Sequence, residues 1–314
     1  MLIVTGGAGF IGSNLVHALN ARGRDDILVV DDLTDGRKFA NLAGARIADY
    51  LDRADFRERI AAGADFGPVD AVFHQGACTD TTEWNGQYML DQNFAFSKGL
   101  FAWCQAHQTP MIYASSAAVY GSGDDFREDA PAPRPLNVYG WSKLLFDQWL
   151  ARQGERSART VGLRYFNVYG PHEAHKKRMA SVVHHFDRQL RDTGTVRLFA
   201  ASHGVGDGEH RRDFVFVGDV VAVNLWAFES GRADGVYNVG TGQSRSFNDL
   251  ARAVIAAHGS GRIEYIPMPA DLGAAYQAFT EADISRLRRD GYAADFVSVE
   301  EGVARTLSAN GPPA

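Results

Sequence analysis

Short apolar runs alternate with helix-like stretches through the first half of the chain. Each run is apolar at consecutive positions, which is typical of a parallel strand that is buried on both faces of its sheet. Helices between such strands favour a parallel sheet covered on both sides. The predicted strands are 2–4, 27–30, 71–74, 110–114 and 161–165, and the predicted helices include 11–22 and 141–151.

Beyond residue 167 the pattern becomes irregular. We expect strands at 196–199, 214–217, 236–239 and 263–266, helices at 181–192, 220–229 and 247–258, and a polar, glycine-rich loop at 203–210. The expected fold class is α/β. It comprises a doubly wound parallel-sheet Rossmann domain from 1–166 and 214–240, and a smaller mixed α/β substrate-binding domain from 167–213 and 241–314.

Composition narrows the class of protein. The 314 residues are 45% hydrophobic and carry a net charge of -6, and no basic run suggests a nucleic acid or a membrane surface as partner. No apolar segment is long enough to span a bilayer, and the N-terminus enters a strand without a basic signal-peptide region. Two cysteines, Cys78 and Cys104, argue against a disulfide framework or a cysteine-rich zinc site. We expect a cytoplasmic protein with no metal site.

A glycine-rich loop, TGGAGFIG at 5–12, follows the first strand and opens the first helix. Gly6 or Gly7 permits the tight turn, Gly9 lets the backbone approach a pyrophosphate, and Gly12 lets the helix pack closely on the sheet. The helix N-terminus supplies N–H groups and positive potential for phosphates. A plain glycine turn is the alternative, but the strand–turn–helix context predicts a dinucleotide site.

The second strand ends in two carboxylates, and its surroundings carry signals for both forms of the cofactor. Asp31 is placed to bind the adenosine ribose hydroxyls, which favours NAD. Lys38 and Arg53 could bind a 2′-phosphate, or could be solvated surface charges. Asp32 puts a second carboxylate beside that pocket, which weakens the case for NADP.

Residues 74–78 end the third apolar strand (71–74) in small side chains, where the chain passes under the expected cofactor. Cys78 is more typical of a buried small residue than of a nucleophile, since no partner base is apparent. Asn93 begins the next predicted helix, and a helix cap is its simplest role.

A catalytic constellation is predicted from Ser116, Tyr139 and Lys143. Positions 139 and 143 share one helix face, so the Lys143 ammonium is expected to lower the pKa of the Tyr139 phenol. Such a phenol can take and return the proton of a substrate alcohol. Ser116 ends the preceding strand, where its hydroxyl could bind the substrate oxygen; a turn serine and an incidental Tyr–Lys pair are the alternatives.

The glycine loop, Ser116, the Tyr139/Lys143 pair and the segment 212–220 (RDFVFVGDV) together resemble the extended short-chain dehydrogenase/reductase family, which acts largely on nucleotide sugars. Within it, the segments 76–84 (GACTDTTEW), 164–171 (RYFNVYGP) with 175–181, and 276–280 (YQAFT) are similar to the ADP-heptose 6-epimerases. The resemblance runs along essentially the whole chain. It implies an isomerase that inverts C6 of an ADP-heptose for the lipopolysaccharide core, using NADP (NAD is possible), as a homo-oligomer, specifically a homopentamer.

The resemblance also implies residue roles. The catalytic residues would be Tyr139 and Lys176 as two acid/bases, supported by Ser116 and Lys143; from the residues alone, Lys176 is part of a solvated basic run. The cofactor would be bound by Gly6, Gly9, Phe10, Ile11, Gly12, Asp31, Asp32, Lys38, Arg53, Gln75, Gly76, Ala77, Cys78, Asn93, Tyr139, Lys143, Val168 and Lys176. The substrate would be bound by Ser116, Asn167, Arg178, His185, Phe199, Ser202, Arg212 and Tyr276.

Two alternatives stay open. Another nucleotide-sugar epimerase or a dehydratase would use the same scaffold, although a dehydratase needs an added acid where Ala117 and Ala118 follow Ser116. A cofactor-sensing binding protein without catalysis would be expected to lose Tyr139 or Lys143, and both are present.

Overall fold

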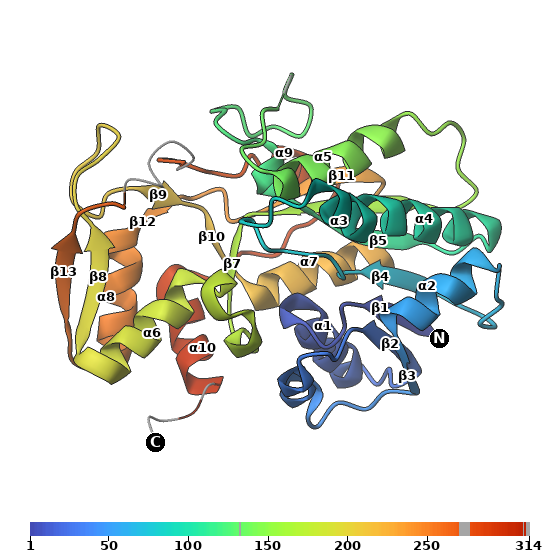
Figure 1. Ribbon diagram of the computed structural model, residues 1–314, viewed down its shortest axis with the longest axis horizontal. Helices are drawn as coiled ribbons and strands as arrows, with labels where there is room; N and C mark the ends of the chain where they lie inside the picture. The colour runs from blue at the N-terminus through green and yellow to red at the C-terminus, as the bar shows by residue number, and fades with distance from the viewer. Residues whose placement is uncertain (132, 270–276, 310, 312–314) are drawn as a thin grey trace.

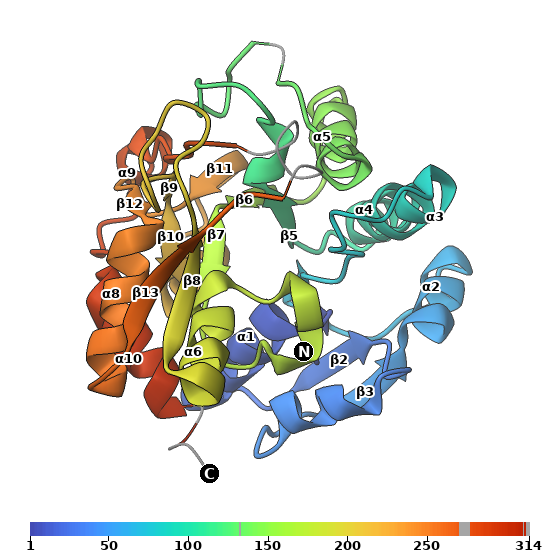
Figure 2. The same cartoon turned by 60° about the vertical axis from the view of Figure 1, so that its left-hand side comes forward.

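A parallel sheet forms the centre of the computed structural model, which describes residues 1–131, 133–269, 277–309 and 311. Within these residues seven parallel strands pair in the order β11-β6-β5-β4-β1-β2-β3. Their bounds in that order are Gly235–Val239, Thr160–Tyr165, Met111–Ser116, Ala71–His74, Leu2–Thr5, Ile27–Asp31 and Asp49–Asp52. Figures 1 and 2 show the helices packed on both faces of this sheet. The predicted doubly wound α/β fold is confirmed.

The two faces of the sheet bury alternate side chains of the same strands, as β-geometry requires. Leu2 and Val4 of β1 belong to one apolar core, and Ile3 between them belongs to the other. The first core is covered by α1 (Phe10–Ala21) and α7 (Val217–Glu229), and the second by α2 (Arg53–Ala61), α4 (Phe96–Ala106) and α5 (Val138–Ala151). The continuous apolar runs thus serve two cores at once.

A separate apolar core lies beyond the sheet, at the left of Figure 1. Its elements are α6 (Val182–Thr193), β8 (Thr195–Phe199), α8 (Phe247–His258), β13 (Arg262–Ile266) and α10 (Val299–Ala309). Strands β7 (Asn167–Tyr169) and β10 (Phe214–Phe216) pair in parallel between the two regions. Leu287 and Tyr292 return to the core of the large sheet. The proposed domain boundaries therefore stay a prediction.

The remaining elements are short. They are the 3-10 helices η1 (Gly36–Leu42), η3 (Ala117–Val119) and η4 (Ala174–Met179), the helices α3 (Gly86–Leu90) and α9 (Ser285–Arg289), the π-helical turn η2 (Asp91–Ala95), and the paired strands β9 (Arg211–Arg212) and β12 (Arg245–Ser246). The sequence pattern missed the edge strand β3, because Asp49 and Asp52 at its ends are exposed and give it no apolar run.

Candidate active site

The glycine loop makes a backbone cradle between β1 and α1. Gly6 has a φ of +68°, a left-handed conformation that glycine adopts without strain. A Cβ on Gly12 would lie 2.1 Å from the Gly6 carbonyl oxygen, so this close approach tolerates only glycine. Gly9 caps α1 without a side-chain hydrogen bond, which leaves the helix N-terminus to a ligand such as a phosphate.

A cavity of about 590 Å³ opens beside this cradle. Its lining includes most of the residues predicted to bind the cofactor: Gly6, Gly9, Phe10, Ile11, Gly12, Asp31, Asp32, Lys38, Arg53, Gln75, Gly76, Ala77, Cys78 and Lys176. The predicted residues outside that lining are Asn93, Tyr139, Lys143 and Val168. The first three contact the 75–78 loop or β5 as described below, and Val168 lies in β7, partly buried. The cradle and the cavity fit an elongated dinucleotide.

Asp31 is a buried carboxylate in the cavity lining, and several groups donate to it. Its Oδ2 accepts a hydrogen bond from the Ala8 amide at 2.7 Å, and its Oδ1 accepts one from the Asp32 amide at 2.7 Å. The Lys38 ammonium lies 2.5 Å from the same Oδ1. Lys38 therefore faces the cavity while its charge is balanced by Asp31.

The second cation, Arg53, makes a longer and more exposed ion pair with its carboxylate than Lys38 does. The Arg53 guanidinium lies 3.1 Å from Asp32, with both side chains about one third exposed. The Thr34 hydroxyl and amide and the Arg53 charge hold the pKa of Asp32 below its ordinary value. Asp32 is therefore ionised here, and the two cations face two acids.

Asn93 holds the loop after β4 through hydrogen bonds to the backbone of Cys78. Its side chain accepts a hydrogen bond from the Cys78 amide at 2.8 Å and donates to the Cys78 carbonyl at 2.9 Å and to Ser142 at 3.0 Å. Asn93 sits inside the π-helical turn η2, in the middle of a helical run, so the predicted helix-capping role is wrong. Its amide instead fixes the loop of small residues that lines the cavity.

Gln75 and Cys78 both line the cavity, but the hydrogen bonds of Gln75 orient its side chain, whereas Cys78 is a half-buried packing residue. Gln75 is bonded to the Tyr165 hydroxyl at 2.9 Å and to Asn224 at 3.0 Å, so its amide is oriented by buried partners. Cys78 is half-buried, and burial raises the pKa of its thiol, which keeps it protonated. The interpretation of Cys78 as a small packing residue agrees with this.

Ser116 and Tyr139 are brought together across the end of β5. The Ser116 hydroxyl accepts a hydrogen bond from the Ala118 amide at 3.1 Å. Burial raises the pKa of Tyr139, and the nearby Ser116 hydroxyl offsets part of that rise. The expected lowering of this pKa by Lys143 is therefore wrong, because desolvation of the phenol is the largest effect.

Lys143 shares helix α5 with Tyr139, as the spacing predicts, but its ammonium has another partner. Lys143 Nζ donates to the Ala114 carbonyl in β5 at 2.9 Å. Burial lowers the pKa of Lys143 to about 8, although the Asp147 carboxylate opposes the shift. A buried amine with that pKa can hold or release a proton near neutral pH.

Lys176 differs sharply from the basic residues that follow it. Its ammonium lies 5.0 Å from the centre of the Phe10 ring, and burial lowers the pKa of Lys176. Lys177 and Arg178 are exposed. The basic run therefore contains one cavity-lining amine and two surface cations.

Arg178 and His185 lie beside the segment 79–84. Arg178 pairs with Asp80 at 2.8 Å and donates to the Thr82 hydroxyl at 2.6 Å. A ring nitrogen of His185 lies 3.3 Å from the Arg178 carbonyl oxygen. These contacts bring two predicted substrate residues together at the rim of the cavity, close to Met179 and Asp80 of its lining.

The other predicted substrate residues come from the region of β7, β8 and β9. Asn167 is exposed at the start of β7, and Ser202 contacts His210 at 3.1 Å in the loop after Phe199. Arg212 is buried, with its guanidinium bonded to the carbonyls of Arg211 and Gln277 and 5.7 Å from the Phe247 ring centre. Tyr276 lies outside the described residues. None of these described residues lines the 590 Å³ cavity.

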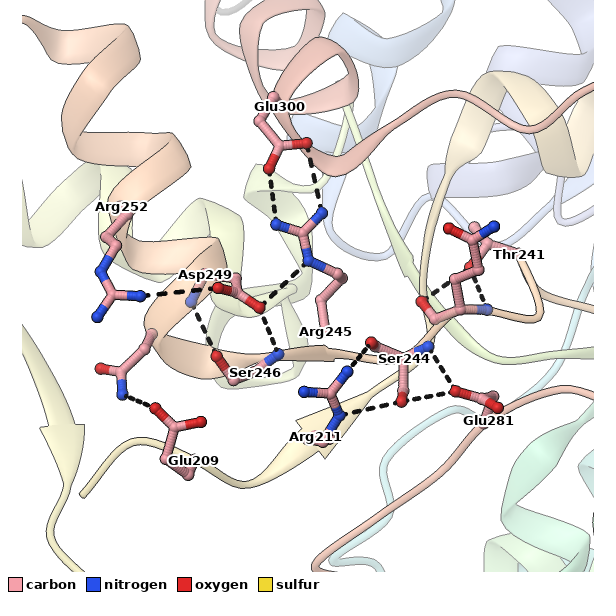
Figure 3. A network of polar contacts seen from close by, with 12 residues as sticks. Glu209, Arg211, Thr241, Ser244, Arg245, Ser246, Asp249, Arg252, Glu281 and Glu300 are labelled. Carbon is pink, nitrogen blue, oxygen red and sulfur yellow. Dashed lines mark hydrogen bonds and ion pairs between the residues drawn. The ribbon is translucent and has the colours of Figure 1, made fainter. Parts of the chain in front are cut away.

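A polar network holds β9, and with it Arg212, against the neighbouring segments (Figure 3). The Ser244 hydroxyl donates to Glu281 at 2.7 Å, Arg211 donates to Ser244, and Arg245 pairs with Glu300 at 2.7 Å. Asp213 next to Arg212 is fully buried and accepts backbone hydrogen bonds from Thr241, Gly242 and Ala282. Arg212 and Asp213 are thus both buried and both bonded to backbone groups of neighbouring segments.

One cavity residue, His175, carries no signal in the sequence by itself. His175 lines the cavity, and the Asn41 amide lies 3.1 Å from its Nδ1. Burial and the charges of Lys38 and Lys176 lower the pKa of His175 to about 4, so it is neutral at pH 7. The match of the segment 175–181 to the epimerases was the one signal that could have indicated it.

No helix in the described part of the chain is long and apolar enough to cross a membrane. Among the described residues, no three His, Cys, Asp or Glu side chains gather as metal ligands.

The sheet, the glycine cradle and the Ser–Tyr–Lys group define a nucleotide-dependent oxidoreductase-type scaffold, and comparison with known families agrees. Residues 2–240 match the NAD dependent epimerase/dehydratase family, and the chain belongs to that family. The sequence is also 58% identical over 310 residues to the ADP-L-glycero-D-manno-heptose-6-epimerase of Alkalilimnicola ehrlichii, covering 98% of this chain and 97% of that protein.

Solved structures of the same family superimpose along the whole chain. The ADP-L-glycero-D-manno-heptose-6-epimerase of Helicobacter pylori has 31% sequence identity and a TM-score of 0.85, over 98% of this chain and 94% of that one. UDP-glucose 4-epimerase of Thermus thermophilus, solved with NAD, has 29% identity and a TM-score of 0.80, over 98% of both chains.

Proposed function

We propose that this chain epimerises ADP-D-glycero-D-manno-heptose at C6 to ADP-L-glycero-D-manno-heptose, for the heptose supply of the lipopolysaccharide core. The observation that carries the proposal is the 58% identity to an ADP-heptose 6-epimerase across 98% of the chain. The Ser116–Tyr139 contact at the end of β5 adds a group able to move the proton of a sugar hydroxyl.

The cofactor proposed is NADP, with NAD as the alternative. Its phosphates would lie on the Gly6–Gly12 cradle, and Lys38 and Arg53 would meet a 2′-phosphate. The cavity lining supports this, since both cations face it. Asp31 and Asp32, which pair with these cations, favour NAD by competing with a phosphate for them. When bound there, the nicotinamide would supply a hydride acceptor for the oxidation at C6 and a hydride donor for the reduction.

Tyr139 is the proposed acid/base on one face of the sugar. Its phenol takes the proton of the C6 hydroxyl as that carbon is oxidised to a ketone. Ser116 would donate a hydrogen bond to the phenolate. The buried Lys143 connects α5 to β5 through its hydrogen bond to the Ala114 carbonyl. Because burial raises the pKa of Tyr139, the phenolate needs the positive potential of neighbouring groups to form.

Lys176 is the proposed second acid/base. After the ketone presents its other face, a second proton donor is needed on that side, which a one-base dehydrogenase does not require. Support comes from the burial of the Lys176 amine against Phe10, whereas Lys177 beside it is solvated. An amine with a lowered pKa exchanges protons more readily near neutral pH than an ordinary lysine.

The proposal includes the substrate residues Asn167, Arg178, His185, Phe199, Ser202, Arg212 and Tyr276, and the two-domain division given above. Arg212 suits a pyrophosphate, because a guanidinium binds two phosphate oxygens at once. Self-association as a homopentamer is also part of the proposal and rests on the family resemblance. Sedimentation velocity of the purified chain tests it.

The second candidate is another nucleotide-sugar epimerase or dehydratase. The similarity to the UDP-glucose 4-epimerase of Thermus thermophilus supports a 4-epimerase as the alternative function. A dehydratase is disfavoured, since Ala117 and Ala118 stand where an acid near the reacting hydroxyl would be needed.

Proton NMR in deuterated water tests the function. The purified chain, without added cofactor, is incubated with ADP-D-glycero-D-manno-heptose. Appearance of the L-glycero epimer without deuterium at C6 supports the substrate and a returned hydride. No change, with cofactor shown to be bound, refutes the heptose assignment and directs the search to UDP- and dTDP-hexoses.

Three variants assign the roles in the same assay. Tyr139→Phe and Lys176→Met should each lower turnover by roughly two to four orders of magnitude while cofactor stays bound, since each removes a proton-transfer group. Lys177→Met is the matched control, because it deletes the same charge from the solvated neighbour. Equal activities of Lys176→Met and Lys177→Met would mean that Lys176 has no catalytic role and is an ordinary surface cation.

A further inference from the structure

A buried carboxylate lies at the turn that leads into the segment carrying Lys176. Glu173 is 2% exposed, whereas the next residue, Ala174, and the cations Lys177 and Arg178 are exposed. A carboxylate is rarely buried unless hydrogen bonds satisfy it. Glu173 must therefore be hydrogen-bonded to groups in the surrounding segment.

Three hydrogen bonds satisfy Glu173, and all three donors belong to the ends of this segment. Oε1 accepts the Gly170 amide at 3.0 Å and the Ser181 hydroxyl at 2.7 Å, and Oε2 accepts the Ser181 amide at 2.6 Å. Every partner is a donor, which suits the ionised carboxylate. Burial raises the pKa of Glu173, and the Lys176 charge and these hydrogen bonds oppose that rise. The side chain thus ties the end of β7 to the start of α6 and closes the segment 170–181 into a loop.

Lys176 sits within this loop and is connected to Glu173 in two ways. The Lys176 amide donates to the Glu173 carbonyl at 2.8 Å, which fixes the backbone from which the ammonium projects. The Glu173 carboxylate also favours the charged form of Lys176, against the burial that disfavours it. The same residue therefore bonds to the Lys176 backbone and opposes, through its charge, the effect of burial on the Lys176 pKa.

We propose that Glu173 is the positioning residue for Lys176: its buried carboxylate holds the loop that presents the amine and places a negative charge within that loop. This inference rests on the proposed function insofar as Lys176 is a second acid/base. It assigns no contact between Glu173 and the substrate.

Glu173→Gln tests the charge with the least change in shape. The amide oxygen can still accept from Gly170 and the Ser181 hydroxyl, while the amide nitrogen replaces the oxygen that accepts the Ser181 N–H, and the negative charge is gone. The first readout is the pH dependence of acetylation of Lys176 by acetic anhydride, followed by peptide mass spectrometry. We expect the midpoint at Lys176 to move to lower pH, while the midpoint at Lys177 stays. An unmoved midpoint at Lys176 overturns the proposal.

The second readout is epimerisation. We expect kcat of Glu173→Gln to fall roughly ten- to hundredfold with bound cofactor retained, since misplacing a catalytic group by a small distance has effects of this size. The pH limb that disappears in Lys176→Met should move to lower pH in Glu173→Gln. A lower kcat with an unshifted limb would mean a purely structural role.

Ser181→Ala is the matched control. It removes one hydrogen bond to Glu173 and the cap of α6, but it keeps the carboxylate charge. We expect its Lys176 midpoint to match the wild type. If Glu173→Gln does not fold, Glu173→Asp takes its place: the shorter side chain cannot bridge Gly170 and Ser181 together, so wild-type kcat in that variant overturns the proposal.

The two levels of failure are separate. A wild-type chain that does not epimerise the ADP-heptose refutes the proposed function, and the acetylation midpoints still test the link between Glu173 and Lys176. A wild-type chain that epimerises, together with an unshifted midpoint in Glu173→Gln, refutes the positioning role alone.

Discussion

Replacing Gly12 with alanine tests whether the glycine cradle depends on close backbone approach. The added Cβ would lie 2.1 Å from the Gly6 carbonyl oxygen and 2.9 Å from the Gly7 Cα. Both neighbours are backbone atoms, which no side-chain rotation can move away. To relieve the contact, the Gly6 carbonyl must shift by about 1 Å, and the bond that it accepts from Gly9 at 3.0 Å must weaken.

The magnitude follows from two opposing effects. Overpacking of this kind costs about 1–3 kcal/mol, while alanine gains about 1 kcal/mol over glycine in a helix. Gly99 in α4 provides the control, because a Cβ there meets nothing within 4 Å. Both variants gain the same helix propensity, so Gly12→Ala should be less stable than Gly99→Ala by about 1–3 kcal/mol.

Two assays decide the outcome. In thermal unfolding, Gly12→Ala should melt roughly 2–6 °C below Gly99→Ala, from the size dependence of the unfolding entropy. The cofactor content per chain, measured by absorbance after denaturation, should fall strongly in Gly12→Ala and stay at the wild-type level in Gly99→Ala. Equal melting temperatures and equal cofactor content would refute the close approach and with it the dinucleotide cradle.

Three further predictions follow from buried charges. Asp147→Ala should lower the free energy of unfolding by about 3–5 kcal/mol in urea titration, because it leaves the buried Arg164, 3.0 Å away, without its carboxylate; a loss below about 1 kcal/mol would contradict this. Burial lowers the pKa of His74 from 6.5 to about 3, so the unfolded state binds the extra proton as the pH falls through that window. Stability should be complete above pH 6.5 and drop by up to about 1.4 kcal/mol per pH unit below it, and His74→Gln should flatten that slope. Lys38→Ala should weaken NADP at least about tenfold by isothermal titration and leave NAD nearly unchanged, because it removes a phosphate partner and frees Asp31; equal losses would contradict a 2′-phosphate site.

Much of the central sheet could be predicted from the sequence, because buried parallel strands require continuous apolar runs. The strands at 2–4, 27–30, 71–74 and 161–165 were each confirmed within a residue at either end. The edge strand β3 was missed, since a strand with one open side needs no apolar run and Asp49 and Asp52 carry none. Periodicity therefore reports burial and misses pairing without burial.

The helical pair Tyr139/Lys143 was also determined locally. Both lie in α5, as the four-residue spacing requires. The electrostatic consequence was not determined locally, because Lys143 donates to Ala114 of a different element and burial dominates the pKa of Tyr139. Desolvation depends on everything packed around a group, which spacing along one helix does not contain.

The order of residues by itself indicated the layered α/β fold, because buried parallel strands require continuous apolar runs. It also indicated the glycine cradle and the helix that carries the phenol, because their signals lie within one short segment. Only the tertiary structure separated Lys176 from Lys177, by placing one amine against Phe10 and leaving the other in water. It also moved Asn93 from a helix cap to a support of Cys78. These outcomes depend on contacts between residues far apart in the chain, which form only when the whole molecule is packed.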